Sequence, residues 1–82
     1  MISRLNRGKK VVGFKQTRKA VRRGSAAAVF LAEDADPVMT GALAALCREH
    51  RVSVAPVSTM RQLGALCGIA VGACAAALLK EE

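Results

Sequence analysis

The sequence predicts an α/β fold, an α-β-α sandwich in which helices cover both faces of a single sheet. Two observations lead to this prediction. Short apolar runs alternate along the chain with amphipathic or capped helical segments, and 52% of the 82 residues are hydrophobic while only 2% are aromatic. A chain of this length has room for one core, built here from Val, Leu, Ile and Ala, so we expect one domain over residues 1–82.

The N-terminal part predicts two helices and two strands. Residues 3–9 predict a short basic helix, and the β-type run at 10–13 ends in a glycine. Residues 14–23 predict an amphipathic helix with one apolar side, which Gly24 ends as a C′ glycine. Residues 27–32 form a short apolar run, which is typical of a buried strand.

A further helix and strand follow from Asp36 onward. Asp36 is a preferred N-cap and Pro37 a preferred first helical residue, so we expect a helix to about His50. Its buried positions should be Val38, Leu43, Leu46 and Cys47. Residues 52–57 predict the next strand because they are rich in β-branched residues.

The C-terminal segment predicts the last helix and the last strand. Thr59 and Gln62 have the spacing of a capping box, which opens a helix that Gly68 ends. A loop at 69–72 then leads to a strand at 73–79. Strands that alternate with helices in this way predict a sheet covered on both faces.

Residues 63–79 also invite comparison with a membrane span. They carry no charge, and their glycines recur every four residues, as in packed transmembrane helices. The segment is rich in Ala and Gly, so insertion would be weakly driven, and the cap and turn signals divide it. We therefore expect no membrane span.

Positive charge is concentrated in the N-terminal part of the chain. Residues 1–32 contain nine Lys and Arg side chains and no acid, whereas the remainder has four bases against six acids, which gives +9 followed by −2. Such a field attracts a polyanion, of which nucleic acid is the first candidate and an anionic membrane the second. A basic face that only aids solubility is the remaining alternative. Organellar transit peptides are also basic, but this stretch runs directly into patterned segments.

Few side chains are candidates for catalysis or metal binding. Three cysteines lie among apolar residues without a CxxC spacing, namely Cys47, Cys67 and Cys74. They predict buried thiols in a reducing cytosol. Three clustered acids could hold a hard cation, namely Glu33, Asp34 and Asp36, although the last is accounted for as a cap. With His50 as the single histidine, we expect no enzyme and no cofactor.

The strongest site candidate is the start of the predicted helix at 14–23. Because a strand ends in Gly13 and a helix begins at once, backbone N–H groups and the positive end of the helix dipole point outward. Lys15 and Gln16 lie in the first turn, and Lys19 lies one turn farther along. Lysine binds phosphate without reading sequence, whereas an amide can reach a base edge. Many exposed helices carry two lysines at this spacing, so this pattern has moderate specificity.

The second site candidate is the apolar loop between Gly68 and Gly72. Apolar residues between glycines are as often core or strand as they are functional. The functional interpretation is an exposed tip, Ile69-Ala70-Val71, that packs against an unstacked base, as recognition of bulged RNA requires.

Three separated segments together resemble a known family. GFKQTRKAVRRG (13–24), LAEDADP (31–37) and LGALCGIAVGA (63–73) resemble, in this order, the ribosomal L7Ae/L30e family of kink-turn RNA-binding proteins, above all its short bacterial members. The resemblance covers nearly the whole chain and implies a three-layer α-β-α sandwich around a four-stranded mixed sheet. It also implies a target RNA that bends sharply at an internal loop flanked by tandem G·A pairs.

The resemblance also implies roles for individual residues. Gly13 and Phe14 open the helix that enters the major groove, and Lys15 and Gln16 match the two positions that contact the sheared bases. Lys19 matches a lysine on phosphate or guanine, and Arg23 matches a further backbone contact. Ile69, Ala70 and Val71 match the loop that covers the flipped-out nucleotide. Archaeal members carry Asn-Glu in place of Lys15-Gln16, a change that should raise general RNA affinity and loosen discrimination.

These observations together predict a cytoplasmic, monomeric, ribosome-associated or ribosomal protein that stabilises kinked RNA. Ribosomal RNA is one candidate target, and we expect no membrane or DNA partner. The rival from another class is a basic peripheral membrane or scaffold protein without RNA specificity.

Overall fold

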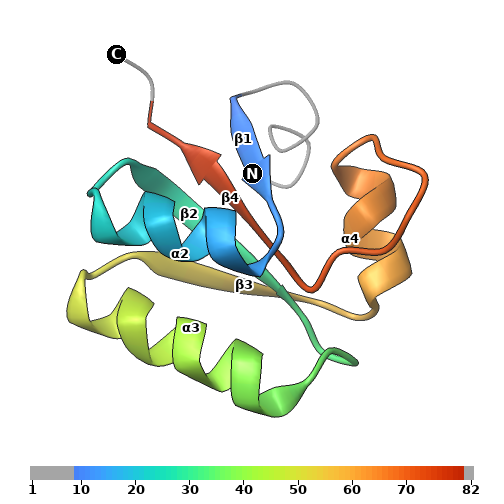
Figure 1. Cartoon of the computed structure of the whole chain (residues 1–82), viewed down its shortest axis with the longest axis horizontal. Coiled ribbons are helices and arrows are strands. Elements are labelled where there is room, and N and C mark those ends of the chain that lie inside the picture. The colour runs from blue at the N-terminus through green and yellow to red at the C-terminus, as the bar shows by residue number, and fades with distance from the viewer. Residues whose placement is uncertain (1–8, 81–82) are drawn as a thin grey trace.

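The computed structural model describes residues 9–80 of the chain. The elements are β1 (Lys10–Val12), α2 (Phe14–Arg22), β2 (Ala26–Ala32), α3 (Pro37–Glu49), β3 (Ser53–Val57), α4 (Met60–Leu66) and β4 (Ala75–Leu79) (Figure 1). The order of helices and strands expected from the sequence is confirmed over this range. The basic helix expected at 3–9 lies outside the described residues except for Lys9.

The four strands form one mixed sheet in the order β1-β4-β2-β3. Strand β4 runs antiparallel to both of its neighbours, β1 and β2, whereas β2 and β3 are parallel. The expected four-stranded mixed sheet is therefore confirmed. Strand β4 lies between β1 and β2, although it is the last strand in the sequence.

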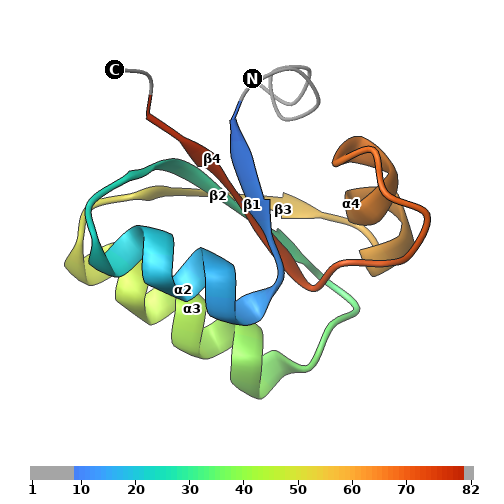
Figure 2. The same ribbon diagram turned by 45° about the horizontal axis from the view of Figure 1, so that its top comes forward.

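Alternate residues of β2 face two separate apolar clusters. Val29 and Leu31 pack with residues of α2 and α3, while Ala28 and Phe30 pack with residues of α4. Because successive side chains of a strand point to opposite faces, α2 and α3 cover one face of the sheet and α4 covers the other. Figure 2 shows α2 and α3 side by side and α4 apart from them, which confirms the α-β-α sandwich.

Two glycines end the helices that the sequence assigned to them. Gly24 and Gly68 have φ of 75° and 78°, in the left-handed region that favours glycine. After α2, the N–H of Gly24 donates to Val21 O at 3.1 Å and that of Ser25 to Ala20 O at 3.0 Å. The same pair of bonds follows α4, so both helices end in a Schellman motif.

Both predicted N-caps are confirmed. Asp36 Oδ1 accepts a hydrogen bond from Val38 N at 2.9 Å, with Pro37 as the first residue of α3. Thr59 Oγ1 accepts from Gln62 N at 3.0 Å at the start of α4. These bonds satisfy backbone donors that a helix terminus otherwise leaves unpaired.

One predicted core position of α3 is wrong. Leu43 and Cys47 are buried and Leu46 is partly buried, as expected, but Val38 is 78% exposed. Val38 precedes Leu43 by five residues, which places it about 140° away around the helix at 3.6 residues per turn. It therefore points to solvent while Leu43 points into the core.

The cysteines lie in or beside the core. Cys47 and Cys67 are buried and Cys74 is intermediate, and all three are free thiols. Burial raises the pKa of the Cys47 and Cys67 thiols, and the nearby charge of Lys10 opposes that rise at Cys67. The expected buried thiols are thus confirmed at two positions and in part at the third.

The apolar C-terminal segment folds back on itself and is not one long helix. Gly64 has no room for a side chain because the carbonyl of Val71 lies against it, and Gly72 lies against Met60. The glycine spacing therefore reflects this close packing of the loop on α4. Strand β4 begins at Ala75, two residues later than expected. Within residues 9–80, no helix is long and apolar enough to cross a membrane.

Candidate nucleic-acid interface

The loops that carry the candidate residues meet at one end of the sheet. Strands β1, β2 and β3 end there and β4 begins there, since β4 runs opposite to the others. Gly13 N donates to Ala75 O at 2.8 Å, and Ala32 N donates to Cys74 O at 2.9 Å. The turn before α2 is thus hydrogen-bonded to Ala75, the first residue of β4, which is the strand that the apolar loop leads into (Figure 1).

The start of α2 offers uncapped backbone donors and positive charge. Gly13 is the N-cap with φ of 104°, and no side chain caps this helix. The first turn contains no acid, and Lys15 and Gln16 are both exposed. Free N–H groups, the helix dipole and a lysine ammonium group therefore combine into a site for anions and for hydrogen-bond acceptors.

Lys19 and Arg23 extend this positive surface along α2. Both are exposed, and together with Gln16 they line a depression of about 110 Å³. Val11, Ala20 and Leu79 are among its other lining residues. Three of the predicted RNA-binding side chains are therefore gathered around one hollow, where their donors can converge on phosphate oxygens.

Phe14 is placed differently from the other candidates of α2. Its ring is partly buried against the cluster under α2 and α3, and the Arg18 guanidinium lies over it with 5.3 Å between Cζ and the ring centroid. The ring is a packing and cation–π partner at the start of the helix. It positions the start of the helix, while the neighbouring Lys15 and Gln16 offer the polar groups.

The apolar loop is exposed and its backbone is held in place. Ile69 and Val71 are 37% and 69% exposed, and Ala70 is exposed as well. Ile69 N donates to Gly64 O and Ala73 N donates to Met60 O, both at 3.0 Å. The alternative that these residues are core is therefore wrong, because α4 holds the loop backbone while the side chains face solvent.

Residues 2–82 match the ribosomal protein L7Ae/L30e/S12e/Gadd45 family. The chain belongs to this family.

Curated relatives agree with the family assignment. A protein of Geobacillus kaustophilus named "RNA-binding protein GK0100" is 45% identical over 76 residues, 93% of each chain. A Bacillus pumilus protein named "RNA-binding protein" is 42% identical over 69 residues, 84% of each chain. The expectation that the chain is not an enzyme accords with this family and with these names.

Solved structures share the fold. The 15.5kD RNA binding protein of Giardia lamblia superposes with a TM-score of 0.90 and 26% identity, over 99% of this chain and 72% of that one. A protein of unknown function from Bacillus halodurans gives a TM-score of 0.86 with 23% identity, over 96% of this chain and 83% of that one. The second match supports the fold alone.

Met60 lies beside the apolar loop from Ile69 to Val71, a position that was not predicted from the sequence. It is 37% exposed, its carbonyl accepts from Ala73, and Gly72 packs against it. Its position as the first residue of a capped helix was visible in the sequence. Its place beside the loop depends on how the chain returns from α4 to β4, which no local pattern indicates.

The acidic cluster has a structural explanation. Asp34 Oδ1 accepts from Met60 N at 2.7 Å, and Asp36 caps α3. Among the residues that the structure describes, no group of three His, Cys, Asp or Glu side chains could hold a metal ion. Asp34 therefore joins the loop after β2 to the start of α4.

Proposed function

We propose that this chain binds RNA and that its targets contain kink-turns, sharply bent helices with tandem G·A pairs beside an internal loop. RNA binding is supported by the family and by relatives that carry that name. Kink-turn preference is supported by the geometry of the interface and by the resemblance of residues 13–24 and 63–73 to the family's kink-turn-binding members.

The observation that carries the proposal is the pairing of two chemically different surfaces at one end of the sheet. The basic start of α2 suits phosphates and base edges, while the loop from Ile69 to Val71 suits the face of an unstacked base. The hydrogen bond from Gly13 N to Ala75 O joins the turn before α2 to the start of β4, the strand into which the loop leads. Straight A-form RNA exposes phosphates but no free base, so it can engage only the first surface.

The polar candidate residues of α2 and the residues of the apolar loop each have a proposed role. Lys15 and Gln16 contact the sheared G·A pairs in the major groove, and Lys19 and Arg23 bind phosphates around the hollow on α2. Ile69, Ala70 and Val71 cover the nucleotide that the kink expels. Because helix and loop fit the bent RNA together, the protein binds that conformation more tightly and shifts the RNA toward it.

The direct test compares a kink-turn duplex with a straight duplex of equal length in titrations at matched salt. We expect the kink-turn to bind at least about tenfold more tightly, since only it engages the loop. Equal affinity for the two duplexes would contradict the proposal and favour a basic scaffold protein without RNA specificity.

A matched pair of variants isolates the loop. Val71→Asp places a charge where a base should pack, and Val38→Asp makes the same change at a similarly exposed valine on α3. We expect Val71→Asp to remove most of the preference for the kinked duplex and Val38→Asp to retain it. If both variants keep the full preference, the base-covering role of the loop is wrong.

We also propose that the RNA target is ribosomal, as the family description suggests. The expected result is sedimentation of the tagged protein with ribosomal particles in a sucrose gradient, and crosslinks that map to kink-turns of ribosomal RNA. A protein that stays in the free fraction and crosslinks to other RNAs would contradict ribosome association and leave kink-turn binding intact.

A further inference from the structure

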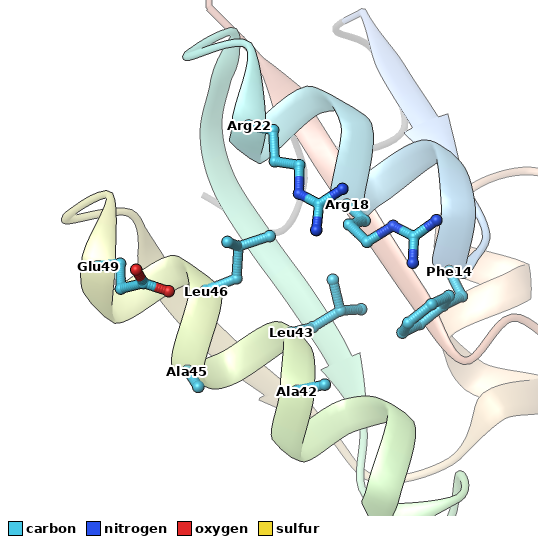
Figure 3. Close-up of a pocket in the computed structure, with 8 residues that line it drawn as sticks. All are labelled: Phe14, Arg18, Arg22, Ala42, Leu43, Ala45, Leu46 and Glu49. Atoms are coloured by element: carbon cyan, nitrogen blue, oxygen red, sulfur yellow. The ribbon is translucent and has the colours of Figure 1, made fainter.

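A groove between α2 and α3 lies apart from the proposed RNA contacts. It has a volume of about 220 Å³ and is lined by Phe14, Arg18, Arg22, Ala42, Leu43, Ala45, Leu46 and Glu49. Phe14, Arg18 and Arg22 recur every four residues and so form one row on α2. The proposed RNA contacts Lys15, Lys19 and Arg23 form the neighbouring row. Figure 3 shows the side chains of Arg18 and Arg22 extending from α2 toward the leucines of α3.

The two walls of this groove differ in chemistry. The α2 wall carries two guanidinium groups, and the α3 wall is aliphatic apart from Glu49 at its end, with Ala42 and Ala45 exposed to solvent. From Pro37 to Cys47, α3 carries no charged side chain at all. An exposed helix face without charge is unusual, because the outer face of a surface helix is ordinarily polar.

The groove suits a peptide better than it suits RNA. RNA presents a phosphate at every nucleotide, yet the α3 wall carries no lysine or arginine side chain. One end of that wall carries the Glu49 carboxylate. A helical peptide can place an acid against Arg18 and Arg22 while its aliphatic side chains enter the groove. A volume of about 220 Å³ is below the roughly 300–1,000 Å³ of small-molecule pockets and suits one or two inserted side chains.

A second copy of this chain fits less well. Of the acids in the described residues, Asp34 and Asp36 already accept backbone hydrogen bonds. Glu33 follows a buried strand, and Glu49 already lines the groove itself. No helix in the described residues carries more than one acid, so a second copy offers no helical face with acids spaced to meet both Arg18 and Arg22.

We propose that the α2–α3 groove binds an acidic amphipathic helix of another protein, with its acids on Arg18 and Arg22 and its aliphatic side chains on Leu43, Leu46 and Ala45. The adjacent row of α2 is left for RNA, so the chain can hold RNA and a protein at the same time. It then acts as a connector within a ribonucleoprotein particle.

The probe is a displayed library of short helices randomised on one face and selected against the full chain. We expect the enriched sequences to combine Asp or Glu with Leu or Ile at helical spacing. The most enriched peptide is then synthesised, together with a version in which its acids are replaced by amides. The amide version should bind about tenfold more weakly or worse.

Two double variants with the same change in charge give the decisive comparison. Arg18→Gln with Arg22→Gln should weaken the peptide about tenfold and leave the kink-turn duplex bound, because it changes the groove row alone. Lys15→Gln with Lys19→Gln should do the reverse. Ala45→Arg fills the groove from the α3 wall and should also abolish peptide binding, with an unchanged circular-dichroism spectrum as the control for folding.

Three results would overturn this inference. The library could enrich no sequence that depends on Arg18 and Arg22. The selected peptide could bind equally well to the variant with Ala45→Arg. Finally, the kink-turn duplex could lose as much affinity in the double arginine variant as in the double lysine variant, which would assign the groove to RNA.

Discussion

Lys19 lies on α2 between two other proposed RNA contacts, Lys15 and Arg23. It lines the hollow on α2 with Gln16 and Arg23 and is exposed, so its ammonium group can meet a phosphate. We predict that Lys19→Ala weakens RNA binding by about 1 kcal/mol, or about fivefold. The slope of log affinity against log salt should fall by about one, as expected for one lost phosphate contact.

The control for this variant is Arg48→Ala. Arg48 is an exposed base in the last turn of α3, at the opposite end of the sheet from Gly13. Both variants remove one positive charge, so a general effect of net charge would appear equally in both titrations. If the two salt slopes change by the same amount, Lys19 has no specific phosphate contact.

Two glycines in helices allow a sharp comparison of stability. A methyl group on Gly64 would collide with the carbonyl of Val71, whereas one on Gly41 of α3 would meet nothing within 4 Å. We predict that Gly64→Ala lowers the free energy of unfolding by about 2 kcal/mol or more, because backbone must move. Gly41→Ala should raise it by roughly 0.5–1 kcal/mol through helix propensity. Urea titrations followed by circular dichroism measure both, and equal effects would contradict the close approach at Gly64.

At the scale of elements, the ends of the helices could be predicted because their signals are local. Asp36-Pro37, Thr59 with Gln62, Gly24 and Gly68 each act within a few residues of the terminus that they define. The residues of the candidate site on α2 could be predicted for the same reason, because a glycine followed by a helical turn with basic residues is visible in the sequence. Whether those residues bind RNA stays a prediction.

Features that depend on distant contacts could not be read in this way. Strand β4 does not begin at Ala73 as expected, because the Ala73 N–H donates to Met60 O at the start of α4 and not to a neighbouring strand. The exposure of the loop and the role of Asp34 likewise follow from how α4 packs against its surroundings. The prediction for Val38 was wrong because it relied on the apolar side chain alone, whereas the spacing of five residues from Leu43 puts Val38 on another side of α3.

Asp34 links two elements that are far apart in the sequence. Its carboxylate accepts the Met60 N–H at 2.7 Å and so ties the start of α4 to the loop after β2. We predict that Asp34→Ala costs about 1 kcal/mol of stability and speeds hydrogen exchange at the Met60 and Ala73 amides, because the base of the apolar loop loosens. RNA affinity should fall severalfold although no proposed contact is removed.

Asp34→Asn is the matched control because its amide oxygen can still accept the same hydrogen bond. It removes the same negative charge as the alanine variant. If the asparagine variant loses as much RNA affinity as the alanine variant, the charge of Asp34 matters and its hydrogen bond does not.

At the scale of the whole molecule, the two apolar clusters share β2 and β4 and are filled mainly by small aliphatic side chains. Ala75, Ala76 and Ala77 of β4 are fully buried, and Phe30 is the one fully buried aromatic residue in the described range. Such a core buries little apolar area per residue, so the stability of the free chain should be modest. A large share of the stability available to the protein would then come from its ligand.

An RNA that binds the folded chain and not the unfolded chain must therefore raise the stability of the protein by mass action. At a free concentration about one hundred times the Kd, a kink-turn duplex should add about 2.7 kcal/mol to the free energy of unfolding. For a domain of this size that corresponds to a rise in Tm of roughly 10–20 °C, measurable by calorimetry. A straight duplex at the same concentration should give a smaller rise, because it reaches the basic start of α2 but not the loop. The variant with Lys15→Gln and Lys19→Gln should lose most of the rise, and an undiminished rise would move the RNA site away from α2.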